Sequence, residues 1–346
     1  MSQTYLALQA LGVLAAFLLA YVLFGLFQAR SLVRREFAAY FVSPIAYVVM
    51  VVFLAVTGYL YAGTFQLLTA TGPRGTEYPW RSMFADERFW LVFLVIPPLL
   101  TMRLFAEERS SGTLEPLMTA PLHDWQVVLG KYAACLAFYV VLWLPTLAYV
   151  PALQIAHEPL PASDFSFTPW SLGFLAGLGL AIVGLVLLVP RLGTTGRLVS
   201  VLLFAGGVGL AIAAGVMHFG HDEQKLVAIP VGIDPYPALS TYLGLLLAGA
   251  MFLALGIFVS SLVRDQLVAA ILAMALGLPF ILAGFFRPEA QGTLASQVVY
   301  YLSVPLHFDR AFTRGIVDTR PLVLYGSVTL FCLFLTVRSL ESRRWQ

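Results

Sequence analysis

Eight stretches of this chain are almost wholly apolar and about as long as a lipid bilayer is thick. They are Tyr5–Phe27, Pro44–Tyr61, Leu129–Val150, Trp170–Val189, Leu198–Met217, Leu239–Leu262, Leu267–Phe286 and Leu322–Val337. A helix needs about 20 mainly apolar residues to cross the hydrocarbon core. Because lipid offers no partners for backbone amides and carbonyls, such runs cross the membrane as helices. The sequence therefore predicts an all-α polytopic membrane protein.

A ninth run, Phe89–Met102, is shorter and contains Pro97-Pro98. An apolar stretch of about 14 residues suits either a span or a buried segment. We interpret it as a span, because the charges on either side of it require a crossing. The total is then about nine transmembrane helices. The paired prolines predict a kink, with neighbouring helices satisfying the freed carbonyls.

The overall composition agrees with a membrane protein. Hydrophobic residues make up 60% of the chain and charged residues 11%, against roughly 45–50% and about 25% in soluble domains. The first run could be a signal peptide, but it has no basic start, and Arg30, Arg34 and Arg35 follow it directly. These features favour a retained span with the N-terminus outside.

The distribution of basic residues predicts the orientation of the spans. With the N-terminus outside, nine crossings put the C-terminus inside, and 12 of the 20 Lys and Arg residues fall in the inside segments. The short loops Arg191–Arg197 and Arg264–Gln266 lie among them. This excess of positive charge is typical of cytoplasmic loops. We therefore expect the N-terminus outside and the C-terminus inside.

The sequence does not support a cysteine-based, metal, nucleotide-binding or ion-coupling site. Cys135 and Cys332 lie in apolar runs without a CxxC pair, and His218-x-x-His221-Asp222-Glu223 is interpreted as a solvated loop. Gly193-Thr-Thr-Gly-Arg is not a P-loop, so the chain is not expected to bind a cofactor or hydrolyse ATP by itself. Charged residues are almost missing from the middle of the predicted spans, which argues against an ion-coupled carrier.

The segment Ser31–Ser43 has the pattern of an interfacial helix. Val33, Phe37, Tyr40 and Phe41 follow helical spacing along one face, whereas Arg34 and Arg35 fall off it. A helix of this kind lies in the membrane surface with its cations toward anionic headgroups.

Three motifs together resemble a known family. Phe105-Ala-Glu-Glu-x-x-x-Gly-Thr-Leu-Glu115 is followed by Pro121 and then by Trp125 through Gly130-Lys131. Arg35-Glu-Phe-x-x-Tyr-Phe-x-Ser-Pro-Ile-Ala-Tyr47 precedes the second span, and Phe258-Val-Ser-Ser-Leu-Val-Arg-Asp-Gln-x-Val-Ala-Ala270 joins two later spans. In order and spacing they resemble the ABC-2 type permeases, and most closely those related to the gliding-motility exporter subunit.

The resemblance implies the transmembrane subunit of an ATP-driven exporter in a bacterial inner membrane. Such a permease binds no nucleotide and no nucleic acid. Two copies of a separate ABC ATPase carry ATP and Mg, and the permease works as a homodimer or with a sister permease. The coupling segment expected to meet the ATPase comprises Phe105, Glu107, Glu108, Arg109, Gly112, Thr113, Leu114, Glu115 and Leu117. The elbow helix contributes Arg34, Arg35, Glu36 and Phe37, and an inner loop contributes Ser260, Ser261, Arg264 and Asp265.

Local sequence signals add an expectation about the shape of the coupling segment. Gly112 and Pro116 interrupt the stretch Glu107–Pro121. We expect short helical pieces and turns there, lying at the membrane surface.

The family core has six spans, so three of the nine are additions. This gives an extra N-terminal helix over residues 1–30, an elbow over 31–43 and the first part of the core over 44–155. That first part includes the coupling segment 103–130. An inserted helix pair follows over 156–234, and the last three core helices occupy 235–346.

A second hypothesis is a membrane-embedded scaffold or enzyme that uses no ATPase. It would need polar clusters at the membrane face, for which Asp86-Glu87-Arg88 and His307-x-Asp309-Arg310 are the candidates. The transported substrate cannot be read from the sequence.

Overall fold

A computed structural model describes residues 27–71, 79–84, 87–113, 123–150, 235–285 and 294–342, together with Gly25 and nine isolated positions between 176 and 213. The described residues form helices and connecting turns, with no strand among them. The α-helices are α2 (Arg30–Val42), α3 (Pro44–Thr71), α4 (Pro79–Phe84), α5 (Glu87–Thr101), α6 (Arg103–Ser110), α8 (Asp124–Trp143), α12 (Pro235–Leu262), α13 (Gln266–Leu282), α14 (Leu294–Leu302), α15 (Val304–Arg310) and α16 (Thr319–Glu341). Two short 3₁₀ helices are η1 (Leu144–Ala148) and η3 (Phe312–Arg314).

Five of these helical stretches are long and apolar enough to cross a membrane: Ala46–Thr64, Arg88–Ser110, Asp124–Ala148, Tyr236–Leu262 and Thr319–Glu341. A sixth apolar helix, Gln266–Leu282, is shorter. The prediction of an all-α polytopic membrane protein is therefore confirmed. The predicted spans Tyr5–Phe27, Trp170–Val189 and Leu198–Met217 lie almost entirely outside the described residues.

Several helix starts follow from local sequence. Proline is the first residue of α3, α4 and α12, a position where its missing amide hydrogen costs nothing. The carboxylate of Asp265 accepts the amides of Leu267 and Val268 at the start of α13. Side-chain oxygens at this position satisfy amides that have no partner within the helix.

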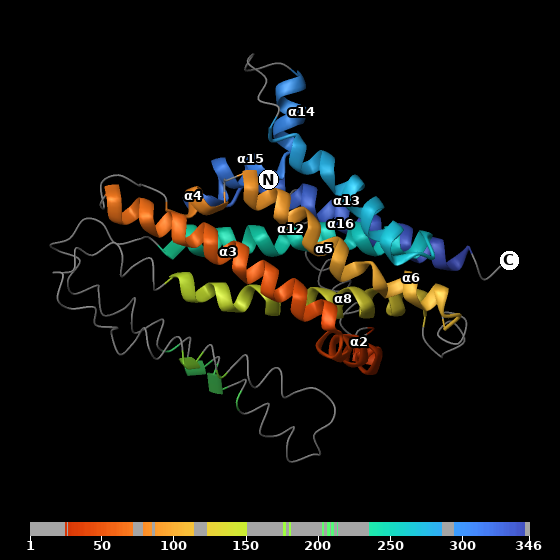
Figure 1. Ribbon diagram of the computed structural model, residues 1–346. Helices are drawn as coiled ribbons and strands as arrows, with labels where there is room; N and C mark the ends of the chain where they lie inside the picture. Colours follow the sequence, from red (N-terminus) through yellow and green to blue (C-terminus); the bar gives the residue numbers. More distant parts are fainter. Residues whose placement is uncertain are drawn as a thin grey trace, which may run out of the picture.

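Helix α12 is the centre of the bundle. It packs against α16, α13, α5, α6, α8 and η3, and Figure 1 shows it running the length of the molecule among them. Close packing against α8 depends on Gly249, where an added Cβ would lie 2.2 Å from Cζ of the buried Tyr139. The Tyr139 hydroxyl also donates to the Leu245 carbonyl at 3.0 Å. A small residue lets the two backbones approach, as is common between membrane helices.

The two ends of the bundle differ in character. At one end, α4 and α15 pack against each other and against η3, and the buried rings of Trp80, Trp90, Phe308 and Phe312 fill the space. We call this the α4–α15 end. Arg81 of α4 and Asp309 of α15 form an ion pair of 2.7 Å there.

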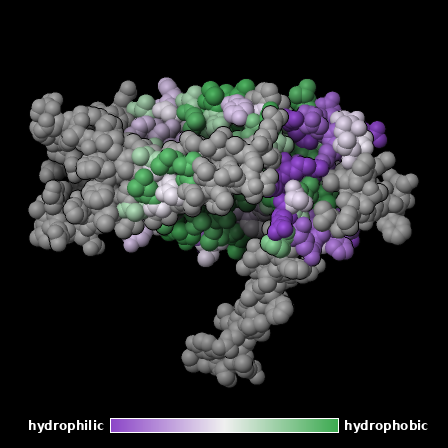
Figure 2. Space-filling view, turned by 90° about the horizontal axis from the view of Figure 1, so that it is seen from below, coloured by the Kyte–Doolittle hydropathy of each residue, from purple (hydrophilic) through white to green (hydrophobic). Residues whose placement is uncertain are grey.

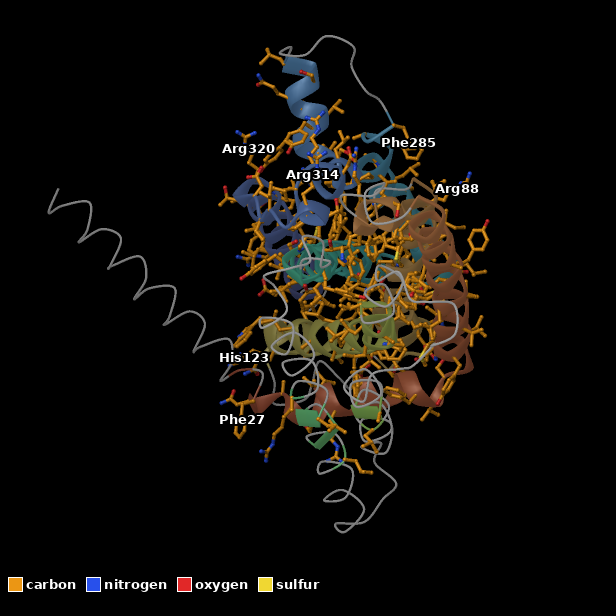
Figure 3. The ribbon with its side chains drawn as sticks, turned by 90° about the vertical axis from the view of Figure 1, so that its left-hand side faces the viewer. Phe27, Arg88, His123, Phe285, Arg314 and Arg320 are labelled. Carbon is orange, nitrogen blue, oxygen red and sulfur yellow. The ribbon has the colours of Figure 1, made fainter. Side chains whose placement is uncertain are left out.

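The opposite end carries α2, α6 and the C-terminus (Figure 1), and we call it the α2–α6 end. Figure 2 shows hydrophilic residues gathered in a band at this end, beside hydrophobic surface along the bundle. Viewed along the bundle, α2 crosses the base of the other helices, with Phe27 and His123 at one end of it (Figure 3). Charged side chains thus concentrate where α2 and α6 meet the spans.

Candidate functional site

The polar band at the α2–α6 end begins where α5 passes into α6. Helix α5 continues through Pro97 and Pro98 and is interrupted only at Met102, so the interruption lies beyond the prolines where the sequence predicted a kink. The Ser260 hydroxyl of α12 enters this junction. It accepts the amides of Phe105 and Ala106 and donates to the Met102 carbonyl, each at 3.1 Å. A side chain inserted in this way takes the place of the helical hydrogen bond from the Ala106 amide to the Met102 carbonyl.

The expectation of short helical pieces and turns over Glu107–Pro121 stays a prediction beyond Thr113, and in the described part the eight-residue helix α6 is followed by a turn over residues 111–113. Glu107, Glu108 and Arg109 belong to α6, which follows α5 after a single residue, and Arg88–Ser110 forms one apolar helical stretch. The physical reason is that Ser260 satisfies the backbone groups exposed at Met102, so the chain can resume a helix immediately.

Replacing Ser260 with alanine should destabilise the protein by about 1–3 kcal/mol, since two buried amides and a carbonyl lose their partner. Ser261→Ala is the matched control, because the equally buried Ser261 hydroxyl only donates to Phe258 within its own helix. Thermal unfolding of the purified variants measures the difference. Equal melting temperatures for the two would show that the junction does not depend on Ser260.

Two further contacts at the predicted inner loop cap the ends of helices. The Arg109 guanidinium donates to the carbonyls of Ser261 and Val263, at 2.7 and 3.2 Å, and so caps the C-terminal end of α12. A cation at this position also interacts favourably with the helix dipole. Asp265 caps α13, and the side chain of Arg264 is exposed. Through Arg109, α6 is tied directly to the loop between α12 and α13.

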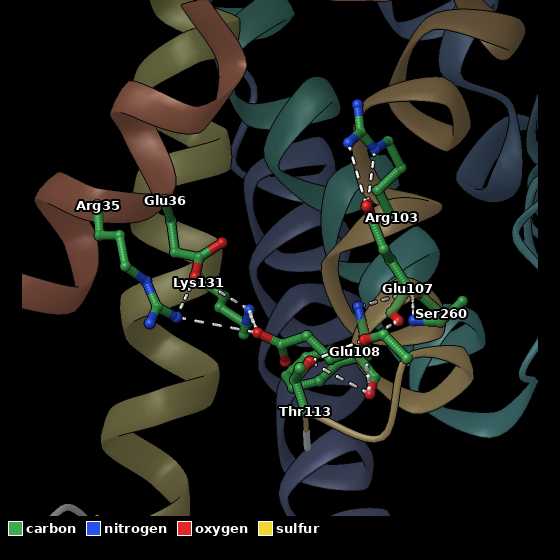
Figure 4. A network of polar contacts seen from close by, with 11 residues as sticks. Arg35, Glu36, Arg103, Glu107, Glu108, Thr113, Lys131 and Ser260 are labelled. Atoms are coloured by element: carbon green, nitrogen blue, oxygen red, sulfur yellow. Dashed lines mark hydrogen bonds and ion pairs between the residues drawn. The ribbon is translucent and has the colours of Figure 1, made fainter. Parts of the chain in front are cut away.

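A cluster of charges joins α2, α6 and α8. The Lys131 ammonium of α8 lies 2.8 Å from Glu108 Oε1 and 3.3 Å from Glu36 Oε1 (Figure 4). Arg35 pairs with Glu36 at 2.9 Å, and its guanidinium lies 3.9 Å from Glu108. We call these four residues the Lys131 cluster. They bring a residue of the predicted coupling segment into contact with two residues of the predicted elbow.

Burial makes this cluster different from surface ion pairs. The Lys131 side chain is 1% exposed, whereas those of Glu36 and Glu108 are 13% and 17% exposed. The Lys131 ammonium also lies 5.4 Å from the centre of the Phe105 ring, close enough for a cation–π interaction. Lysine side chains are almost never fully buried unless they are paired. The cluster therefore fixes the relative position of three helices.

A second ion pair lies beside the cluster. Arg103 pairs with Glu107 at 2.8 Å and donates to the Ser43 hydroxyl between α2 and α3. The Tyr40 hydroxyl donates to the Leu100 carbonyl at 2.9 Å, which joins α2 to the end of α5. Both contacts strengthen the attachment of α2 to the α5–α6 junction.

Helix α6 ends in a turn built from the predicted coupling residues. The Ser111 hydroxyl donates to the Glu107 carbonyl at 2.8 Å, and Thr113 Oγ1 lies 2.9 Å from Ser111 Oγ. Gly112 adopts a left-handed conformation with φ of 71°, which a residue with a side chain enters only at a cost. Leu114, Glu115 and Leu117 lie outside the described residues.

Of the predicted elbow residues, Arg35 and Glu36 belong to the Lys131 cluster, and the others lie outside it. Arg34 is exposed, Phe37 is half-buried, and its ring lies 5.2 Å from that of Phe41 in an edge-on arrangement. Glu36 faces Lys131, so it points toward the bundle rather than toward headgroups.

Sequence reasoning did not select Lys131 or Arg103 as site residues. Lys131 lay near the start of the apolar run Leu129–Val150 and entered only as the end of a family motif, whereas α8 begins at Asp124 and places it well inside a helix. A charged residue within an apolar helix is a signal of function, and it would have identified Lys131.

Of the clusters considered for an enzyme, the structure describes Glu87, Arg88 and the stretch His307–Arg310. His307 is buried, with Nδ1 3.0 Å from the Tyr325 hydroxyl, and burial lowers the pKa of its imidazole to about 4. Asp309, two residues on, is instead paired with Arg81. Asp86 and the stretch His218–Glu223 lie outside the described residues. Both cysteines are free and buried.

Comparison with known protein families gives a match. A family model described as ABC-2 family transporter protein matches residues 32–205, about half of the chain. The match covers most of α2, the α5–α6 junction and Lys131. No curated protein and no solved structure matches the chain significantly.

Proposed function

Because the chain belongs to the ABC-2 family of transporter proteins, we propose that it is the membrane-spanning permease of an exporter driven by a separate ABC ATPase. The ATPase, in two copies, would bind ATP and Mg, while this chain provides the path across the membrane. We further propose that the permease acts as a homodimer or with a sister permease. The motif pattern also supports membership of the gliding-motility-related group.

The proposed setting is a bacterial inner membrane, with the N-terminus outside and the C-terminus inside. In that orientation the α2–α6 end faces the cytoplasm, where an ATPase is found. The excess of arginine in the predicted inside segments supports this choice.

The observation that carries the proposal is the convergence of three distant segments at one end of the bundle. Glu108 meets Glu36 through Lys131, and Arg109 binds the carbonyls that end α12. A force applied to α6 would therefore reach α2, α8 and α12 together. This is the linkage expected of a surface that transmits the movement of a partner into membrane helices.

Purification of the tagged full-length chain from its own host tests this proposal. We expect a P-loop ATPase to co-purify in a stoichiometric complex. A chain that purifies repeatedly without such a protein, under mild detergent conditions, would contradict the permease assignment and favour the scaffold or enzyme alternative.

A further inference from the structure

Helix α14 is held against α15 through the ring of Tyr300. The helix extends away from the bundle (Figures 1 and 3), and Leu294 and Val298 on its outer face are 81% and 63% exposed. On its other side, the Tyr300 ring lies edge-on to the His307 ring, with 5.8 Å between centroids. The Arg310 guanidinium lies 4.9 Å from the centre of the same ring. His307 therefore forms part of the seat on which α14 rests.

His307 also connects α15 to α16. Its Nδ1 lies 3.0 Å from the Tyr325 hydroxyl, and the two residues are 0% and 1% exposed. His307 Nε2 is buried and has no hydrogen-bond partner among the described residues. None of the ion pairs in the described part of the chain includes His307. One buried hydrogen bond thus joins the two helices at this point.

This hydrogen bond suits only a neutral imidazole. We assign the Tyr325 hydroxyl as the donor to Nδ1, because its hydrogen has no other acceptor among the described residues. In a protonated imidazole both ring nitrogens are donors. Nδ1 would then face the Tyr325 hydroxyl with a hydrogen of its own, and the hydroxyl hydrogen would have to turn away without a partner. A buried donor left in this state is costly.

The charged groups near His307 do not compensate for its burial. Asp309 is paired with Arg81 of α4, and Arg314 of η3 donates to the Asp309 carbonyl. Asp318, the N-cap of α16, favours the charged imidazole. Helices α12 and α13, which also pack against α15, contain no charged residue. Burial has the larger effect, and it lowers the pKa of His307 to about 4.

We propose that His307 is an acid-sensitive latch, which holds α14 and α15 against α16 and releases them when its imidazole is protonated. Release would break the bond to Tyr325 and displace the edge-on contact with Tyr300, so that both helices leave α16 together. Arg310, three residues beyond His307, is exposed, so a small opening would admit water to the ring. In the proposed orientation this end of the bundle faces outside, but the latch requires neither that orientation nor an ATPase.

The direction of the pH effect follows from the two states of the latch. In the open state His307 would have the ordinary pKa of about 6.5, whereas in the closed state the pKa is lowered to about 4. The closed state is therefore fully stable above about pH 6.5 and loses stability as the pH falls toward 4. Between about pH 7.5 and about pH 5, opening should become more favourable on the order of tenfold.

Hydrogen exchange of the purified full-length chain tests the proposal. Mass spectrometry would follow peptides that cover residues 294–310 at about pH 7.5 and about pH 5, after correction for the intrinsic pH dependence of exchange. Peptides from α12 serve as the internal reference. We expect opening of α14 and α15 to rise on the order of tenfold at the lower pH, while α12 changes little. Equal protection at the two pH values would overturn the proposal, and so would an equal loss in α12, which indicates general unfolding in acid.

Three variants identify the responsible group. His307→Asn places an amide near the position of Nδ1 and does not titrate, so it should keep the protection at neutral pH and lose the response to acid. His123→Asn, at an exposed position at the opposite end of the bundle, is the matched control and should keep the response. Tyr325→Phe retains the imidazole without its partner, so α14 and α15 should open more readily even at neutral pH. A full acid response in His307→Asn, or unchanged protection in Tyr325→Phe, would contradict the latch.

Discussion

Lys131→Met is expected to destabilise the protein by about 3–5 kcal/mol, because it leaves the carboxylates of Glu36 and Glu108 close together without their buried cation. Methionine fills a similar volume, so the effect arises from charge and not from a cavity. Scanning fluorimetry of the detergent-purified chain should show a fall in Tm on the order of 10 °C.

The triple variant Lys131→Met, Glu36→Gln and Glu108→Gln provides the control for this result. It removes all three buried charges, and replacing a complete buried ion-pair group with neutral residues is often close to neutral in stability. The triple variant should therefore regain most of the lost Tm. If Lys131→Met alone unfolded at the wild-type temperature, the cluster would have no structural role.

Gly249→Leu should have a comparably large effect, because it separates α12 from α8. A Cβ at Gly249 would lie 2.2 Å from the buried ring of Tyr139, well inside contact distance. Overpacking of a tight core costs about 1–3 kcal/mol and sometimes more. We expect a lower Tm and a poorly monodisperse protein in size-exclusion chromatography.

Gly326→Leu is the matched substitution, since nothing lies within 4 Å of a Cβ at Gly326 on α16. Leucine has a higher helix propensity than glycine, so this variant should unfold at or slightly above the wild-type temperature. Similar behaviour of the two variants would show that close approach between α8 and α12 is not what Gly249 provides.

The general fold could be predicted because apolar length and backbone hydrogen bonding leave little choice in lipid. Helix ends were harder to place. The run beginning at Leu129 marked the apolar part of α8, but the helix starts at Asp124. Polar residues such as Lys131 are accommodated in the helix by partners that are distant in sequence. Pro97 and Pro98 predicted a kink, and helix α5 continues through both; the helix is interrupted instead at Met102, where Ser260 enters.

The site was predictable only in part for a similar reason. The motifs selected Glu108, Glu36, Arg109 and Ser260 separately, as three stretches with no stated relation to one another. Their contacts depend on how α12 and α8 cross the bundle, and that depends on side-chain packing. A cavity of about 300 Å³ beside the Lys131 cluster was not predictable at all, because it forms between four segments and has no local pattern.

In the proposed exporter, ATP hydrolysis by the partner is coupled to this permease through the end of α6. The most direct test is the ATPase rate of the co-purified complex in lipid vesicles, compared between Gly112→Pro and Gly315→Pro. Both glycines have a positive φ, 71° and 81°, which proline cannot adopt, and they lie at opposite ends of the bundle. Gly315→Pro is the more severe change locally, since it also removes the hydrogen bond from the Gly315 amide to the Phe312 carbonyl. We predict that Gly112→Pro lowers the rate several-fold while Gly315→Pro leaves it close to wild type. Equal rates in the two variants would contradict coupling through α6.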